Sequence, residues 1–146
     1  MEVGALGTVA LPAGRHAYAG SARGPGGVRA RLLRHLRGES ARHWHVDHLR
    51  AAARPEAAWW LHGSARVECR WAAALAGLPA AERAPTGFGA SDCGCDGHLV
   101  RLPDGAGRSL VAGALEEASR GEGPLHRASA ADLLARAGSG EQAGGA

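Results

Sequence analysis

The sequence has no lysine and few of the residues that build large hydrophobic cores. Its 146 residues include one tyrosine, one phenylalanine, four tryptophans and three cysteines, and alanine contributes much of the 45% hydrophobic share. Because large side chains bury the most apolar area, we expect a small core. No segment approaches the roughly 20 apolar residues of a transmembrane helix. We therefore expect no membrane-spanning segment and no membrane partner.

Cysteine usage and the N-terminal residues indicate the cellular compartment. The three cysteines are odd in number and partly clustered, which is untypical of a disulfide framework. The apolar stretch Val3–Ala13 follows Glu2 rather than a basic segment, and Gly4, Gly7 and Pro12 interrupt it, so it is untypical of a signal peptide. We therefore expect a cytoplasmic protein.

Positive charge is concentrated in one part of the chain. All 17 basic residues are arginine, and the segment from Arg23 to Arg54 holds eight of them against two acids, Glu39 and Asp47, a net charge of +6. The remainder of the chain has a net charge of −3. A guanidinium can donate two parallel hydrogen bonds to phosphate oxygens, so the block indicates a polyanion partner. The alternative is an ordinary solvated face that uses arginine in place of lysine.

The order of apolar and turn-forming residues predicts an α+β fold. Two short alternating runs, Gly7–Pro12 and Arg15–Ala19, indicate a hairpin, and a helix is expected from Gly27. We expect further helices over 43–53, 65–78 and 128–137, and further strands over 57–61 and 98–102. Together they predict a small, mainly antiparallel β-sheet flanked by helices.

Length and composition indicate one domain followed by a tail. We assign residues 1–104 to the globular domain and residues 105–137 to a C-terminal extension with a short helix. Residues 138–146 are mostly glycine and small or polar residues with almost nothing to bury. We therefore expect this last segment to be disordered.

One stretch brings together groups that suit a phosphate. Tyr18 lies near the end of a predicted strand that stops at Gly20 and Ser21, and the following helix carries Arg31 and His35 four residues apart. This order places a phenol, backbone amides, a guanidinium and an imidazole in a small space. Taken singly, Tyr18 is more typical of a strand aromatic with its hydroxyl in water, and Arg31 and His35 are more typical of a solvated helix face.

The cysteines raise a separate metal hypothesis. Cys93, Cys95 and His98 lie close together in the sequence, and Cys69 is a candidate fourth ligand. Structural zinc sites need four ligands, and Cys-x-Cys is tighter than their usual spacing. The alternative, which we take as the default, is a buried and reduced anchor for the loop.

An ordered series of motifs resembles the GIY-YIG nuclease superfamily, and in particular its Uri-type branch of small domains. The resemblance covers roughly residues 4 to 102. It is carried by Tyr18-x-Gly20, by Arg31 and His35 on the next helix, by Glu68-Cys69, by His43-Trp44-His45-Val46-Asp47, and by Gly87-Phe88-Gly89-x-Ser91-Asp92-Cys93-x-Cys95-x-x-His98-Leu99.

The resemblance implies a metal-dependent endonuclease acting on nucleic acid, DNA more than RNA. It implies that Tyr18 is the second family tyrosine, that Arg31 stabilises charge on the scissile phosphate, and that His35 helps to hold or deprotonate the nucleophile. Glu68 would be the sole protein ligand of a divalent metal, and one carboxylate with several waters suits Mg²⁺ or Mn²⁺. Supporting or nucleic-acid-contacting roles fall to His16, Gly20, Ser21, Arg34, His43, His45, Asp47, Ser91 and Asp92.

The chain departs from the family at the first motif, which supplies another tyrosine. In the Uri-type branch that strand lies before the stretch Val3-Gly4-Ala5-Leu6-Gly7, and this sequence begins at Met1. Either the sequence is missing its true first strand, or the domain has lost one strand and one catalytic group. Gly7-Thr8-Val9 has a suitable spacing but no hydroxyl at Val9, while His16 lies on the strand face of Tyr18 and can partly compensate. The alternatives to an active nuclease are therefore a catalytically weak or inactive DNA-binding module and a zinc-bound interaction domain.

Overall fold

The computed structural model describes residues 11–22, 26–38, 45–63, 66–83, 88 and 93–144. Its elements in chain order are β1 (His16–Tyr18), α1 (Gly27–Arg37), α2 (His45–Ala52), β2 (Ala57–Trp60), α3 (Val67–Ala76), β3 (Glu82–Arg83), β4 (Leu99–Arg101), α4 (Arg108–Ala118), β5 (His126–Ser129) and α5 (Ala130–Gly144). Within these ranges no helix has the length and apolarity needed to cross a membrane.

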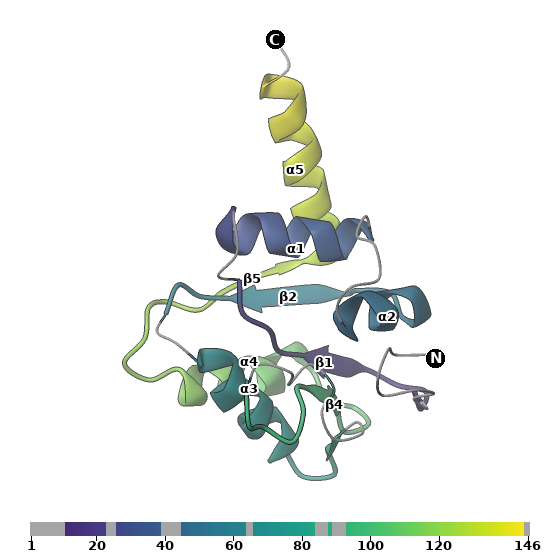
Figure 1. The fold of residues 1–146 in the computed structure, drawn as a ribbon, viewed down its shortest axis with the longest axis vertical. Helices are drawn as coiled ribbons and strands as arrows, with labels where there is room; N and C mark the ends of the chain where they lie inside the picture. Colours follow the sequence, from purple (N-terminus) through teal and green to yellow (C-terminus); the bar gives the residue numbers. More distant parts are fainter. Residues whose placement is uncertain are drawn as a thin grey trace.

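The described strands form two small antiparallel sheets. β4 is the central strand of the first sheet, with β1 and β3 on its two sides, and Val100 pairs with both Ala17 and Arg83. The second sheet consists of β2 and β5, with Trp59 opposite Arg127. Figure 1 shows β2 and β5 between α1 and the part of the molecule that holds β1, β4, α3 and α4. The predicted class, a small α+β domain with antiparallel strands, is confirmed, with the strands divided over two sheets.

Glycine determines where α1 begins. Gly26 and Gly27 have φ angles of 84° and 64°, and a Cβ atom at Gly26 would lie 2.5 Å from the Cβ of Ala30. Glycine takes positive φ without the steric penalty of a side chain, so the chain can turn tightly out of β1 and enter the helix. The helix ends at Gly38, whose N–H donates to the carbonyl of Arg34 at 3.0 Å.

The described core consists of two groups of buried side chains. The larger joins α3, β4 and α4, and contains Leu75, Val100, Leu102, Ala106, Val111 and Leu115. The smaller consists of Phe88 and Leu99, both fully buried, with Leu11, Tyr18 and Leu49 packed against it. The smaller group forms the packed surface against which Tyr18 lies.

Most predicted elements are found where the sequence placed them. The strand expected over Arg15–Ala19 is β1, the strand over 57–61 is β2, and the strand over 98–102 is β4. The helices expected from Gly27, over 43–53 and over 65–78 are α1, α2 and α3. The strand expected over Gly7–Pro12 lies almost entirely outside the described residues, and β1 pairs with β4.

The C-terminal third of the chain differs from the prediction. α4 and β5 were not predicted, nor was β3 earlier in the chain, and α5 extends past the expected end at residue 137 to Gly144, within the segment that was expected to be disordered. Val111 and Leu115 of α4 belong to the same buried group as Val100. Residue 104 is therefore not the end of the packed core, because the predicted extension contributes to it.

Candidate functional site

The end of β1 brings a phenol and a guanidinium together. A Cβ atom at Gly20 would lie 3.1 Å from Cε1 of Tyr18 and 3.3 Å from Nη2 of Arg31. The two side chains thus approach the same backbone position from β1 and from α1, and the missing side chain of Gly20 leaves space between them. Tyr18 is supported from behind by Phe88, with ring centroids 6.2 Å apart in an edge-to-face arrangement.

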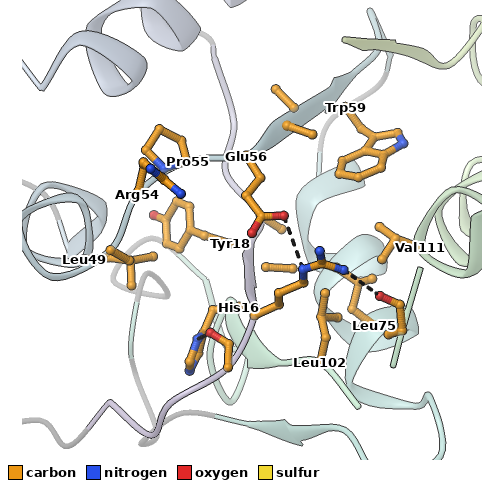
Figure 2. Close-up of a pocket in the computed structure, with 18 of the residues that line it drawn as sticks. His16, Tyr18, Leu49, Arg54, Pro55, Glu56, Trp59, Leu75, Leu102 and Val111 are labelled. Carbon is orange, nitrogen blue, oxygen red and sulfur yellow. Dashed lines mark hydrogen bonds and ion pairs between the residues drawn. The ribbon is translucent and has the colours of Figure 1, made fainter. Parts of the chain in front are cut away.

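A cavity of about 620 Å³ lies beside Tyr18, between β1, β2 and the helices α1 to α4. The predicted site residues that line it are His16, Tyr18 and His35. Arg54 lines it as well, and Figure 2 shows the Tyr18 side chain next to Arg54. The cavity therefore offers a phenol, two imidazoles and at least one guanidinium to a ligand.

One ion pair and one hydrogen bond to the main chain lie in the wall of this cavity. The guanidinium of Arg15 lies 3.2 Å from the carboxylate of Glu56, and it donates a hydrogen bond to the carbonyl of Ala106 at 3.3 Å. Both partners of the ion pair are more than half exposed, so the pair contributes little to stability. Its role is to join β1 to the start of β2 and to the loop before α4.

His16 is held as a neutral imidazole. Its Nδ1 atom lies 3.2 Å from the carbonyl oxygen of Gly14, and its Nε2 atom is buried without a hydrogen-bond partner in the described structure. Burial lowers the pKa of His16, the hydrogen bond to Gly14 raises it less, and the charge of Arg101 lowers it further. A neutral imidazole facing the cavity can accept a proton.

Arg50 positions the last turn of α1, a role that the sequence analysis missed. Its guanidinium donates to the carbonyls of His35 at 3.1 Å and Leu36 at 3.3 Å, and to the carbonyl of Ala53 at 3.3 Å. Cations at a helix C-terminus satisfy carbonyls that have no partner within the helix. α2 thereby holds the backbone of His35. The only sequence signal for this contact was the membership of Arg50 in the basic block.

Glu68 lies apart from the cavity. It occupies the first turn of α3, is half-buried, and is absent from the cavity lining. Its carboxylate lies close enough to His98 to affect that residue electrostatically: burial lowers the pKa of His98, while the hydrogen bond to Ala19 and the charge of Glu68 raise it less. Because His98 contacts Ala19, Glu68 lies near the end of β1, although it does not line the cavity.

The predicted zinc residues come together with Cys69. The ligand atoms of Cys69, Cys93, Cys95 and His98 all lie within 4.8 Å of one another, and we call these four residues the Cys3His cluster. All three cysteines are free thiols and are partly buried, and His98 is 4% exposed. The cluster has the ligand number and types of a metal-binding site, and the structure supplies the fourth ligand from α3.

The ionisation of the thiols is not uniform. Burial raises the pKa of the Cys69 thiol to about 12, and hydrogen bonds to Cys95 and Cys93 act in the same direction. Burial opposes the ionisation of Cys93, but hydrogen bonds from Cys95 and Cys69, together with the charge of Arg66, outweigh it and lower the pKa of Cys93. Cys93 therefore becomes a thiolate, the form that binds metal, more readily than Cys69 does.

The remaining candidates are placed as follows. Gly20 and Ser21 follow β1, and Arg34 is exposed on α1. His45 and Asp47 lie in α2, but their side chains are outside the described part of the structure, as are the residues His43, Ser91 and Asp92. The structure thus collects two groups, Tyr18 with Arg31 at Gly20 and Glu68 with the Cys3His cluster, on either side of Ala19.

The fold and this site define a small α+β domain with a cluster of three thiols and one imidazole near the end of β1. The chain belongs to a family described as "Domain of unknown function DUF123", whose model matches residues 1–119. The match ends directly after α4, which agrees with the contribution of α4 to the core. No curated protein and no solved structure matches this chain.

Proposed function

We propose that this domain is a metal-dependent endonuclease that hydrolyses nucleic-acid phosphodiester bonds, with DNA preferred over RNA. The observation that supports the proposal most directly is the approach of Tyr18 and Arg31 to Gly20 from two different elements. The space over Gly20 can admit a phosphate oxygen between a phenol and a guanidinium. The basic residues on the rest of α1 add a surface for the flanking phosphates, since this helix contains four arginines, one histidine and no acid.

Each side chain has a role that its position permits. Arg31 would stabilise the additional negative charge that develops on the phosphate during attack. Tyr18 or His35 would accept the proton of the attacking water, because both line the same cavity. Arg50 acts on the reaction only indirectly, by holding the carbonyl of His35.

The catalytic metal of this proposal is Mg²⁺ or Mn²⁺ on Glu68. A half-buried carboxylate at the start of a helix fits a hard cation that keeps most of its waters. Such an ion neutralises charge on the leaving oxygen when it is bound. The Cys3His cluster does not suit this ion, because thiolates are soft ligands and Mg²⁺ prefers oxygen. The Mg²⁺ position and the cluster are thus two different sites.

The test is the Mg²⁺-dependent nicking of supercoiled and branched DNA by the purified chain. Tyr18→Phe, Arg31→Ala and Glu68→Gln are each expected to lower the rate by about 100-fold or more, the range of general acid–base and oxyanion-type contributions. Two matched controls are available in exposed positions, Arg29→Ala on the same helix and Glu116→Gln on α4, and both should keep the rate. Full activity in Arg31→Ala and Glu68→Gln would refute the proposed endonuclease mechanism.

One observation favours a second function. Tyr18 is the only tyrosine in the sequence, so the tyrosine of the first family motif has no counterpart in it. The alternative is a DNA-binding module that uses the same basic helix without cleaving. In that case, wild type shows no Mg²⁺-dependent nicking, while its DNA affinity falls steeply with salt. Replacing Arg31 and Arg34 together should reduce that salt dependence.

A cytoplasmic location is part of the same proposal. The three cysteines are free thiols gathered in one place, and thiols stay reduced in the cytosol, where nucleic acid is also present. Labelling of the thiols in intact cells, followed by mass analysis, tests the reduced state. Quantitative oxidation of the cysteines in cells would contradict the location.

A further inference from the structure

We propose that the Cys3His cluster binds one Zn²⁺ ion, and that this ion fastens the segment 93–98 to the first turns of α3. The ion would be structural, and it would hold Glu68 in a constant position relative to the end of β1. This inference does not depend on nuclease activity, because it rests only on the geometry of four side chains.

The ligand set is complete. Three thiols and one imidazole form one of the usual ligand sets of structural zinc, and such sites leave no open position. The four ligand atoms already lie within 4.8 Å of one another, whereas a tetrahedron with Zn–S bonds of about 2.3 Å has edges of about 3.8 Å. Bringing the ligands onto the ion thus requires a movement of about 1 Å, within the reach of side-chain rotation.

The imidazole of His98 is in the tautomer that zinc needs. A carbonyl oxygen can only accept a hydrogen bond, so the contact of 3.1 Å with Ala19 requires the proton on Nδ1. Nε2 is left with its lone pair, and this atom lies 3.5 Å from Sγ of Cys93. A histidine that binds metal through one nitrogen and donates the other N–H to a carbonyl is the usual outer-shell arrangement of zinc sites.

Main-chain hydrogen bonds fix His98 on both sides of this contact. Its N–H donates to the carbonyl of Phe88 at 2.7 Å, and its carbonyl accepts from the N–H of Ala19 at 3.1 Å. His98 precedes β4, which pairs with β1. A Zn²⁺ ion on this imidazole and on Cys69 would therefore link the β1–β4 sheet to α3 directly.

A disulfide explains the same residues less well. It would consume two thiols, and it would leave the third thiol and the buried imidazole of His98 without a reason to converge. The structure contains no disulfide among these three cysteines. The chain has three cysteines, and all three lie here with the buried His98. A bound cation explains why their sulfur atoms and the His98 nitrogen converge.

The first experiment uses the full chain, purified without chelator and without a histidine tag. Metal analysis by mass spectrometry should find one zinc per chain, and replacement by Co²⁺ should give the visible absorption of a tetrahedral thiolate site. The three thiols should react with a thiol reagent at least tenfold more slowly before chelation than after it. A folded wild type that contains no zinc, takes up no Co²⁺, or has lost two hydrogens to a disulfide would overturn the proposal.

The second experiment uses variants. Cys95→Ser should retain at least about tenfold less zinc against a competing chelator, because even the loss of an outer-shell partner lowers zinc affinity by about 10- to 100-fold. His98→Ala should behave likewise, whereas His62→Ala, at an exposed position, should bind zinc as wild type does. Should Cys95→Ser fail to fold, the thiol protection of wild type remains the deciding measurement. Unchanged zinc content in Cys95→Ser would also refute the site.

Discussion

His98 and Ala19 are joined by two hydrogen bonds, one from the side chain of His98 and one between the main chains. Nδ1 of His98 lies 3.1 Å from the carbonyl oxygen of Ala19, and the N–H of Ala19 donates to the carbonyl of His98 at 3.1 Å. Ala19 separates Tyr18 from Gly20, so this pair connects the Cys3His cluster to the position where the phenol and the guanidinium meet. The Cys3His cluster and the pair Tyr18 and Arg31 are therefore positioned by the same hydrogen-bonded residues, His98 and Ala19.

Gly20→Ala tests whether the space between Tyr18 and Arg31 is functional. The new Cβ would lie 3.1 and 3.3 Å from these side chains, which can move aside because both contacts involve side-chain atoms. We expect stability to change by only about 0.5 kcal/mol, as for most surface substitutions. DNA nicking should fall by about 10- to 100-fold, since a displacement of 1 Å in a catalytic group has effects of that size.

The control for this change is Gly113→Ala, which adds the same methyl group in the exposed middle of α4 with no atom within 4 Å. It should leave nicking unchanged and stabilise the helix by up to about 1 kcal/mol. Equal activity in Gly20→Ala and Gly113→Ala would show that the space over Gly20 is not used.

Arg50→Ala tests the support of α1 by α2. The change removes three hydrogen bonds from a guanidinium to main-chain carbonyls, two of them on the last turn of α1. We expect the free energy of unfolding to fall by about 1–3 kcal/mol, the range for hydrogen bonds that involve a charged group. Urea denaturation followed by circular dichroism measures it. Arg54→Ala, an exposed arginine just beyond α2, should change stability by less than about 0.5 kcal/mol.

Stability should decrease as the pH falls below the ordinary histidine pKa of 6.5, in part because of His16. The pKa of His16 is lowered by burial, so the unfolded chain takes up a proton at a higher pH than the folded chain does. The contribution is complete above pH 6.5 and is lost as the pH falls through the lowered pKa of the folded state. The charged neighbour Arg101 acts in the same direction.

The measurement is thermal unfolding at a series of pH values between 8 and 5 in wild type and in His16→Gln. The variant should lose less stability on acidification than wild type, because it lacks the titrating imidazole. His62→Gln, at an exposed position, provides the comparison and should follow wild type. A His16→Gln curve that is parallel to the wild-type curve would exclude His16 as a contributor.

Leu115→Ala tests whether α4 belongs to the core. Leu115 is 3% exposed and packs in the same buried group as Leu75 and Val100. Truncation of such a buried leucine destabilises by about 2–5 kcal/mol, through lost apolar contact and the cavity that remains. Leu110→Ala removes the same atoms from the same helix where the side chain is 45% exposed, and it should change stability by less than about 1 kcal/mol. Equal effects of the two variants would place α4 outside the cooperative unit.

Local sequence determined the elements whose signals lie within a few neighbouring residues. The alternation around His16 and Tyr18, the glycines before α1 and the apolar periodicity of α3 are each read from a short segment, and the strand and helices were found there. The approach of Tyr18 to Arg31 follows from the same local order, because a strand, a short turn and a helix leave little freedom between them. The class of fold was predictable for this reason.

Elements that depend on a distant partner were not predictable. β5 has the sequence His-Arg-Ala-Ser, with no apolar alternation, and it is a strand because it pairs with β2, more than 60 residues earlier in the chain. α4 contains Gly113, which lowers helix propensity, and the burial of Val111 and Leu115 against α3 and β4 compensates for it.

The sequence by itself determined which ligand types the chain possesses, and the tertiary structure decided which of them meet. The spacing of Cys93, Cys95 and His98 made them candidate ligands, with Cys69 as a candidate fourth, but Cys69 meets them only through the packing of α3 beside the segment before β4. The resemblance named Glu68 as a metal ligand without fixing its neighbours, and the same packing places it near His98 and outside the cavity that Tyr18 lines. Such distances depend on how helices and sheets bury their apolar faces against one another, which local sequence does not record.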